Sequence, residues 1–69
     1  MPKKCMPKKY RMLQQKHWSD LTVKECVYMN ACECLYYGYG FNTLNKCGLE
    51  DWTAKMIWNE AFNDMAREE

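Results

Sequence analysis

The clearest hydrophobic pattern lies in the C-terminal third of the chain. Apolar residues recur there at spacings of three, four and one residues, at Ala54, Trp58, Ala61, Phe62 and Met65. This spacing places them on one face of an α-helix. Gly48 is an acceptable N-cap, and Glu50 and Asp51 complement the positive end of the helix macrodipole. The pattern therefore predicts a helix over residues 49–67.

The middle of the chain has the strongest helix start. Thr22 and Glu25 have the spacing of a capping box, in which each side chain bonds to the backbone N–H of the other residue. Apolar or small residues then follow one helical face at Val23, Val27, Ala31, Cys34, Leu35 and Gly38. Gly38 in this stripe would permit close approach of a neighbour, and Gly40 would end the helix in the left-handed conformation. We predict a central helix over residues 22–38 that is apolar on most sides.

The N-terminal segment predicts a shorter helix. Pro7 suits a first helical position, and Tyr10, Leu13 and His17 form one narrow apolar stripe. The predicted helix covers residues 8–17. The sequence thus predicts an all-α fold of three helices, with a basic arm over residues 1–7 and a single helical domain over residues 8–69. The predicted core comprises Val23, Val27, Ala31, Leu35, Ala54, Trp58, Ala61, Phe62 and Met65.

A second apolar line on the last predicted helix is not needed for that core. It runs nearly opposite the core stripe, through Leu49, Trp52 and Met56, and stops where Asn59, Asn63 and Arg67 occupy the same face. Either the short first helix covers Trp52 and Met56, or a partner does. We predict a partner-binding surface of Trp52 and Met56, assisted by Tyr36 and Tyr37, because surplus Trp, Tyr and Met side chains commonly anchor protein interfaces.

Length and composition restrict the function classes. The chain has 69 residues, of which 48% are hydrophobic, and a net charge of +1. This is enough for one folded domain but not for two cores or an enclosed cofactor cavity. No Ser-His-Asp set, phosphate-binding glycine loop or H-E-x-x-H motif occurs in the sequence. We therefore expect a protein that is not an enzyme and that holds no cofactor.

Charge is distributed unevenly along the chain. Residues 1–17 contain six basic and no acidic residues, which leaves four basic and nine acidic residues for the rest. The basic segment is either a solvated tail, a match for the acidic body, or a nucleic-acid contact. The nucleic-acid alternative would use the tyrosines together with Lys3, Lys4, Lys8, Lys9 and Arg11.

The aromatic stretch at residues 38–41 bears on the same alternative. Gly38-Tyr39-Gly40-Phe41 resembles the middle of the RNP1 pattern of RNA-recognition motifs, whose strand aromatics stack on bases. The preceding residue is Tyr37 rather than Lys or Arg, and the chain lacks the strands of that fold. A helix end is the preferred interpretation.

Five cysteines are present, at positions 5, 26, 32, 34 and 47. An odd count without a secretory signal argues against a disulfide framework and favours reduced cysteines in the cytoplasm. Zinc and redox roles are the alternatives. Cys32 and Cys34 would lie about 200° apart around a helix, which is a poor zinc-binding arrangement. We expect packing cysteines and no metal.

These features favour an interaction protein. We expect a small protein-binding regulator or inhibitor of a larger macromolecule, of the kind that viruses and mobile elements direct at host enzymes. The expected partner is another protein, whose identity the sequence does not give, and no membrane is expected. The alternatives are a nucleic-acid-binding module and a structural homo-oligomer, in which the surplus apolar surface meets a second copy.

Overall fold

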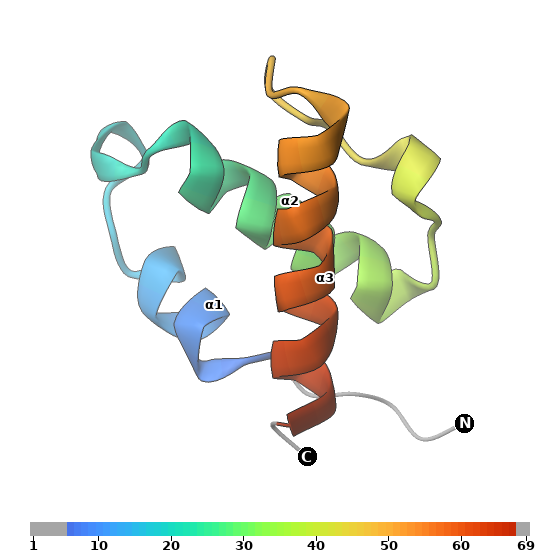
Figure 1. Cartoon of the computed structure of the whole chain (residues 1–69). Coiled ribbons are helices and arrows are strands. Elements are labelled where there is room, and N and C mark those ends of the chain that lie inside the picture. Colours follow the sequence, from blue (N-terminus) through green and yellow to red (C-terminus); the bar gives the residue numbers. More distant parts are fainter. Residues whose placement is uncertain (1–5, 68–69) are drawn as a thin grey trace.

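The computed structural model describes residues 6–67, which form a bundle of three α-helices without a strand. The elements are α1 (Lys8–Gln14), the 3₁₀ helix η1 (Trp18–Asp20), α2 (Val23–Tyr37), the 3₁₀ helix η2 (Phe41–Thr43) and α3 (Asp51–Arg67). In Figure 1, α3 crosses in front of α2, with α1 on one side and the segment that contains η2 on the other. The predicted all-α, three-helix fold is confirmed.

The hydrophobic core lies mainly where α2 and α3 cross. Three fully buried alanines, Ala31, Ala54 and Ala61, allow the two helices to approach closely, because their side chains are small. The other buried hydrophobic residues are Tyr10, Leu13, Val27, Tyr28, Cys32, Leu44, Ile57 and Met65. Tyr10 and Leu13 bring α1 into this core.

Two predicted core residues are exposed instead. Val23 has 49% and Phe62 52% of its surface exposed, and Leu35 and Trp58 are only half-buried. Phe62 follows the fully buried Ala61, and successive helical residues differ by about 100° around the axis. Val23 begins α2 at the end of the helix that lies away from the crossing.

The first helix ends earlier than predicted. It stops at Gln14. The backbone N–H of Lys16 then donates a 3.1 Å hydrogen bond to the carbonyl of Leu13, three residues earlier, which closes a turn. His17 has an extended backbone, and its Nδ1 accepts a hydrogen bond from the backbone N–H of Ser19. His17 therefore caps η1 and is exposed, rather than continuing the apolar stripe. Of the predicted arm over residues 1–7, only residues 6 and 7 are described.

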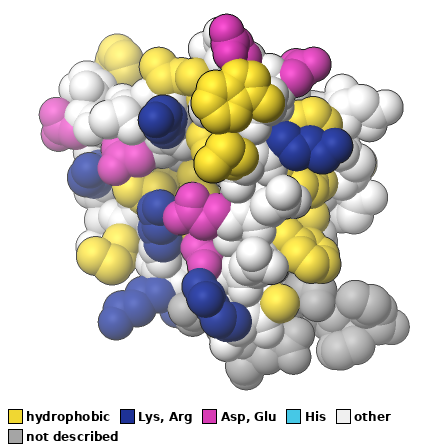
Figure 2. Space-filling view, viewed as in Figure 1, with side chains coloured by type: hydrophobic (Ala, Val, Ile, Leu, Met, Phe, Trp, Pro, Cys, Tyr) yellow, Lys and Arg dark blue, Asp and Glu magenta, His cyan; other side chains and the backbone are white. Residues whose placement is uncertain are grey.

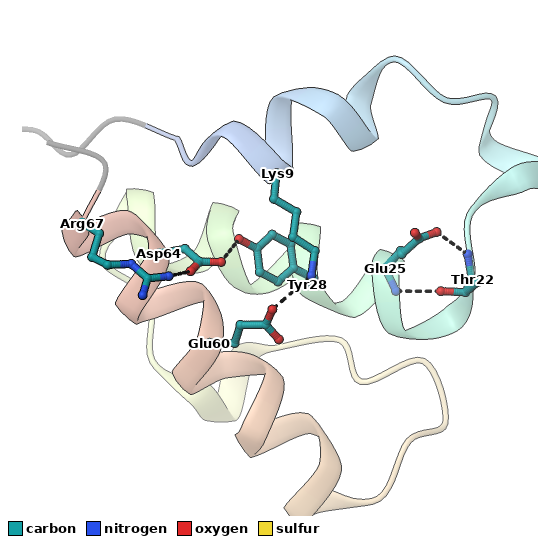
Figure 3. Close-up of polar contacts among 7 residues, drawn as sticks. All are labelled: Lys9, Thr22, Glu25, Tyr28, Glu60, Asp64 and Arg67. Atoms are coloured by element: carbon teal, nitrogen blue, oxygen red, sulfur yellow. Dashed lines mark hydrogen bonds and ion pairs between the residues drawn. The ribbon is translucent and has the colours of Figure 1, made fainter.

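The capping box at the start of α2 is confirmed. Glu25 N–H donates to Thr22 Oγ1 at 3.1 Å, and Thr22 N–H donates to Glu25 Oε1 at 2.9 Å (Figure 3). The helix ends at Gly38, whose φ of 86° is left-handed, so the prediction that Gly40 has this role is wrong. A Cβ atom on Gly38 would meet nothing within 4 Å, so this glycine does not serve close packing either.

The last helix begins two residues later than predicted. Cys47 and Gly48 both have positive φ, and the backbone N–H of Leu49 bonds to the carbonyl of Lys46 in a turn. This turn keeps Gly48 out of the N-cap position. The intrahelical ladder begins where Ala54 N–H bonds to the carbonyl of Glu50 at 2.9 Å.

Candidate protein-binding surface

The outer face of α3 points away from the core. It is a stripe that runs from the loop before the helix to its last turn, through Leu49, Trp52, Met56, Asn59, Asn63 and Ala66. Leu49 is half-buried and the other five residues are exposed. Trp52 and Met56, one helical turn apart, expose 64% and 61% of their surfaces. Figure 2 shows hydrophobic side chains gathered over the N-terminal half of α3.

The first helix does not cover this apolar end. It approaches α3 further along, where Lys9 Nζ lies 3.0 Å from Glu60 Oε2 (Figure 3). Trp52 and Met56 stay exposed, and the indole N–H of Trp52 donates to the carboxylate of Glu50. The sequence left two possibilities, that the first helix covers Trp52 and Met56 or that a partner does. The structure excludes the first helix.

Open hollows flank the exposed pair on both sides. Trp52 and Met56 line the first hollow together with Lys24 of α2 and several polar residues of α3. They also line the second, together with Phe41 and Lys55. The pair therefore forms a ridge with space on either side, into which side chains of another helix could fit.

Tyr36 and Tyr37 lie at the C-terminal end of α2. Their rings pack edge to face with centroids 5.1 Å apart, and Tyr39 follows at 6.4 Å from Tyr37. Tyr37 is exposed and Tyr36 is half-buried. Neither tyrosine lines the two hollows beside Trp52 and Met56. The structure does not join them to that ridge, and their part in partner binding stays a prediction.

A polar network fixes one flank of α3 to the other helices (Figure 3). The buried Tyr28 of α2 donates its hydroxyl to Asp64 at 2.6 Å, and Arg67 donates to the same carboxylate at 2.6 Å. Lys9 Nζ lies 4.5 Å above the Tyr28 ring while it pairs with Glu60. Burial, assisted by the bond to Asp64, raises the pKa of Tyr28 above its usual range. The tyrosine therefore stays a neutral donor.

Two lysines of the basic segment meet acidic residues of the body. Lys9 pairs with Glu60, and Lys16 Nζ lies 3.3 Å from Glu25 Oε2. The backbone N–H of Thr22, assisted by Lys16, lowers the pKa of the Glu25 carboxyl below its usual range. These contacts realise the internal charge match that was one of the predicted alternatives.

Of the other predicted nucleic-acid-binding residues, Lys8 lines an open hollow together with Lys9, Lys16 and Glu25. Lys8 and Arg11 are exposed on α1, and the Arg11 guanidinium donates to the carbonyl of Met6 at 2.6 Å. Lys3 and Lys4 lie outside the described residues.

The cysteines lie in different environments. Cys32 is fully buried, and this burial raises the pKa of its thiol to about 12. Cys26 and Cys34 are half-buried, and Cys47 is exposed. These four described cysteines are free thiols, and Cys5 lies outside the described residues. Within residues 6–67, no three His, Cys, Asp or Glu side chains are placed to hold a metal ion.

The sequence analysis did not identify the exposed residues that flank the α3 stripe on its two sides. Lys55 and Phe62 lie on one side, and Glu60 and Arg67 lie on the other; all four are exposed. Phe62 was assigned to the core because its spacing fits the buried stripe. Phe62 lies about 100° from Ala61 around the axis, so its exposure depends on the rotation of α3 within the fold.

None of the described helices combines the length and the apolar character needed to cross a membrane. A scan against protein-family models and searches of curated proteins and of solved structures find no match to this chain.

Proposed function

We propose that this chain is a small protein-binding regulator, and that it binds its partner through the outer face of α3. The observation that carries the proposal is the joint exposure of Trp52 and Met56 on adjacent turns of one helix. Aromatic and methionine side chains dominate the energetics of many protein interfaces. A pair of this kind is well suited to anchor another chain.

The energetics favour coverage of this ridge by another chain. Complete burial of a large apolar side chain contributes about 1.5–3 kcal/mol relative to full exposure. Trp52 and Met56 still expose 64% and 61% of their surfaces, so most of that free energy is available to a partner. The flanking polar residues, Asn59 and Lys55 among them, supply the polar rim that surrounds the apolar centre of an interface.

A matched pair of tryptophan variants tests the proposal. Trp52 and Trp18 are both exposed, but Trp18 belongs to η1 and not to the α3 face. The tagged chain is used to capture proteins from a cell lysate or a second copy of itself. Trp52→Ala should keep the helical circular dichroism spectrum and weaken capture about thirtyfold, the effect of losing ~2 kcal/mol at an interface anchor.

Trp18→Ala is the control and should keep both the fold and the captured protein. Equal capture by both variants would contradict the proposal. Unfolding of Trp52→Ala would show that Trp52 supports the fold and would remove the basis for an interface at this position.

Nucleic-acid binding stays the second candidate, because Lys8 and Arg11 have no carboxylate partner among the described residues and Tyr37 and Tyr39 are exposed.

A cytoplasmic location, a host enzyme as target and a viral or mobile-element origin remain predictions from the sequence.

A further inference from the structure

The outer face of α3 has the spacing of a coiled-coil seam. Its residues alternate at intervals of three and four, as do positions a and d of a heptad repeat. Positions a are Met56 and Asn63, and positions d are Trp52, Asn59 and Ala66. Leu49 continues the spacing, but it precedes the helix and packs against the core. From Trp52 to Ala66, this stripe lies opposite the buried residues of α3 and all five of its side chains are exposed.

We infer that a second copy of this chain occupies the face, and that the two α3 helices pair in parallel around a two-fold axis. The inference rests on the proposed function and names the occupant of the same surface. The helix has 17 residues, a length of ~25 Å, and its seam is exposed from Trp52 to Ala66.

Charge complementarity points to a second copy. In a parallel pair, position g of one helix faces position e of the following heptad on its partner, five residues later. Lys55 is at g and Glu60 is at e. Each Lys55 would therefore face Glu60 of the other copy, and the two-fold axis repeats this contact.

The next pair of flanking positions is also compatible. Phe62 is at g and Arg67 is at e, so each guanidinium would meet an aromatic ring of the other copy. The Arg67 side chain is 76% exposed, so its guanidinium is accessible to a second copy.

The order of residues along the seam favours the parallel arrangement. In a parallel pair in register, each seam residue faces the same residue of the second copy. The apolar Trp52 and Met56 then contact apolar side chains, and Asn59 and Asn63 contact side-chain amides. An antiparallel pairing over the same length would instead place Trp52 against Asn63. A polar asparagine at an a position also specifies register and oligomeric state, at some cost in stability.

Existing contacts of the flanking charges do not oppose this pairing. The Lys9–Glu60 ion pair is half exposed, with side-chain exposures of 48% and 51%, and such pairs contribute little. Lys55 Nζ lies 5.2 Å from the centre of the Phe41 ring, on its own side of the seam. Both side chains can turn towards a second copy without loss of a buried contact.

Sedimentation equilibrium over a range of concentrations tests the inference. The intact chain should show a mass of about twice 8.3 kDa that dissociates on dilution. Lys55→Glu and Glu60→Lys should each raise the dimer dissociation constant about tenfold, because two attractive contacts become repulsive. An equimolar mixture of these two variants should dimerise like the intact chain, since both contacts are then attractive.

Two controls separate the interface from the fold. Lys9→Gln removes the ion pair with Glu60 but leaves the seam intact, so it should not change the dissociation constant. Trp52→Ala should raise the dissociation constant more than about a hundredfold, because both copies lose an anchor.

The outcomes distinguish this inference from the proposed function. A monomer at all concentrations overturns the second-copy inference. The proposed function then stands only if the intact chain captures another protein and Trp52→Ala captures it more weakly. A dimer that Trp52→Ala does not weaken overturns the second-copy inference, and it contradicts the proposed function as well only if Trp52→Ala also captures proteins as the intact chain does. A dimer that Trp52→Ala weakens but the mixed charge variants do not restore overturns the parallel arrangement.

Discussion

The hydroxyl of Tyr28 donates a 2.6 Å hydrogen bond to the carboxylate of Asp64, and this bond ties the centre of α2 to the last turns of α3. Because Arg67 donates to the other oxygen of the same carboxylate, Asp64 is held from two sides (Figure 3). The contact fixes the rotation of α3 about its axis. That rotation turns Ala54 and Ala61 inward and leaves Trp52 on the outer face.

Tyr28→Phe should therefore destabilise the fold by about 1–2 kcal/mol, since it removes the hydrogen bond to a charged group and keeps the ring. Urea unfolding followed by circular dichroism measures the change. Tyr37→Phe is the matched control on the same helix, at an exposed position, and should change stability by less than ~0.5 kcal/mol. Similar values for the two variants would show that the Tyr28 bond contributes little.

The corrected core predicts a contrast between two neighbours on α3. Met65 is 1% exposed, so Met65→Ala should destabilise the fold by about 2–5 kcal/mol. Phe62→Ala should cost less than ~1 kcal/mol at low protein concentration, because Phe62 is 52% exposed. Thermal melts of both variants give the comparison, and a larger loss for Phe62→Ala would contradict the buried face described above.

The fold should lose stability in alkaline solution. Burial raises the pKa of Cys32 from 9.0 to about 12, so the unfolded thiol ionises before the folded one. The contribution of the neutral Cys32 thiol to the free energy of unfolding is therefore complete below about pH 9. It is lost as the pH rises towards 12. Cys32→Ala should show a smaller fall in urea midpoint between pH 8 and 10.5 than the intact chain, in reducing buffer. Equal falls would assign the alkaline loss to other groups, Tyr28 first among them.

Nucleic acid should bind weakly. Lys9 and Lys16 already pair with Glu60 and Glu25, which reduces the positive charge that α1 offers to phosphates. We expect no binding tighter than about 1 µM to duplex or single-stranded DNA at physiological salt, measured by fluorescence anisotropy. Sub-micromolar binding that falls steeply with added salt would favour the nucleic-acid candidate over the protein-binding one.

Local signals predicted the helices better than their ends. The Thr22–Glu25 box is confirmed because both bonds form between residues three apart and need no tertiary contact. The predicted end of α2 near residue 38 agrees with the structure, but the left-handed residue that follows the helix is Gly38 and not Gly40. Either glycine can adopt positive φ, so the backbone conformation is needed to choose between them. His17 was placed on an apolar stripe, although its ring nitrogen is also able to cap a turn.

The candidate surface was only partly predictable. The helical spacing separated Trp52 and Met56 from the core stripe, and both are exposed. Whether α1 would cover them depended on where that helix ends and how it packs, which the sequence pattern does not determine. The place of Phe62 also required the rotation of α3, which the packing of Ala61 against α2 and the Tyr28–Asp64 bond determine together.

The indole N–H signals of the three tryptophans, followed by nuclear magnetic resonance in a dilution series of the intact chain, test the central claim most directly. If a second copy covers the outer face of α3, the Trp52 signal should shift or broaden between millimolar and low micromolar concentration. The Trp18 signal, which reports an exposed tryptophan of η1, should stay constant. A Trp52 signal that does not change across this range would contradict the claim that a second copy binds this face.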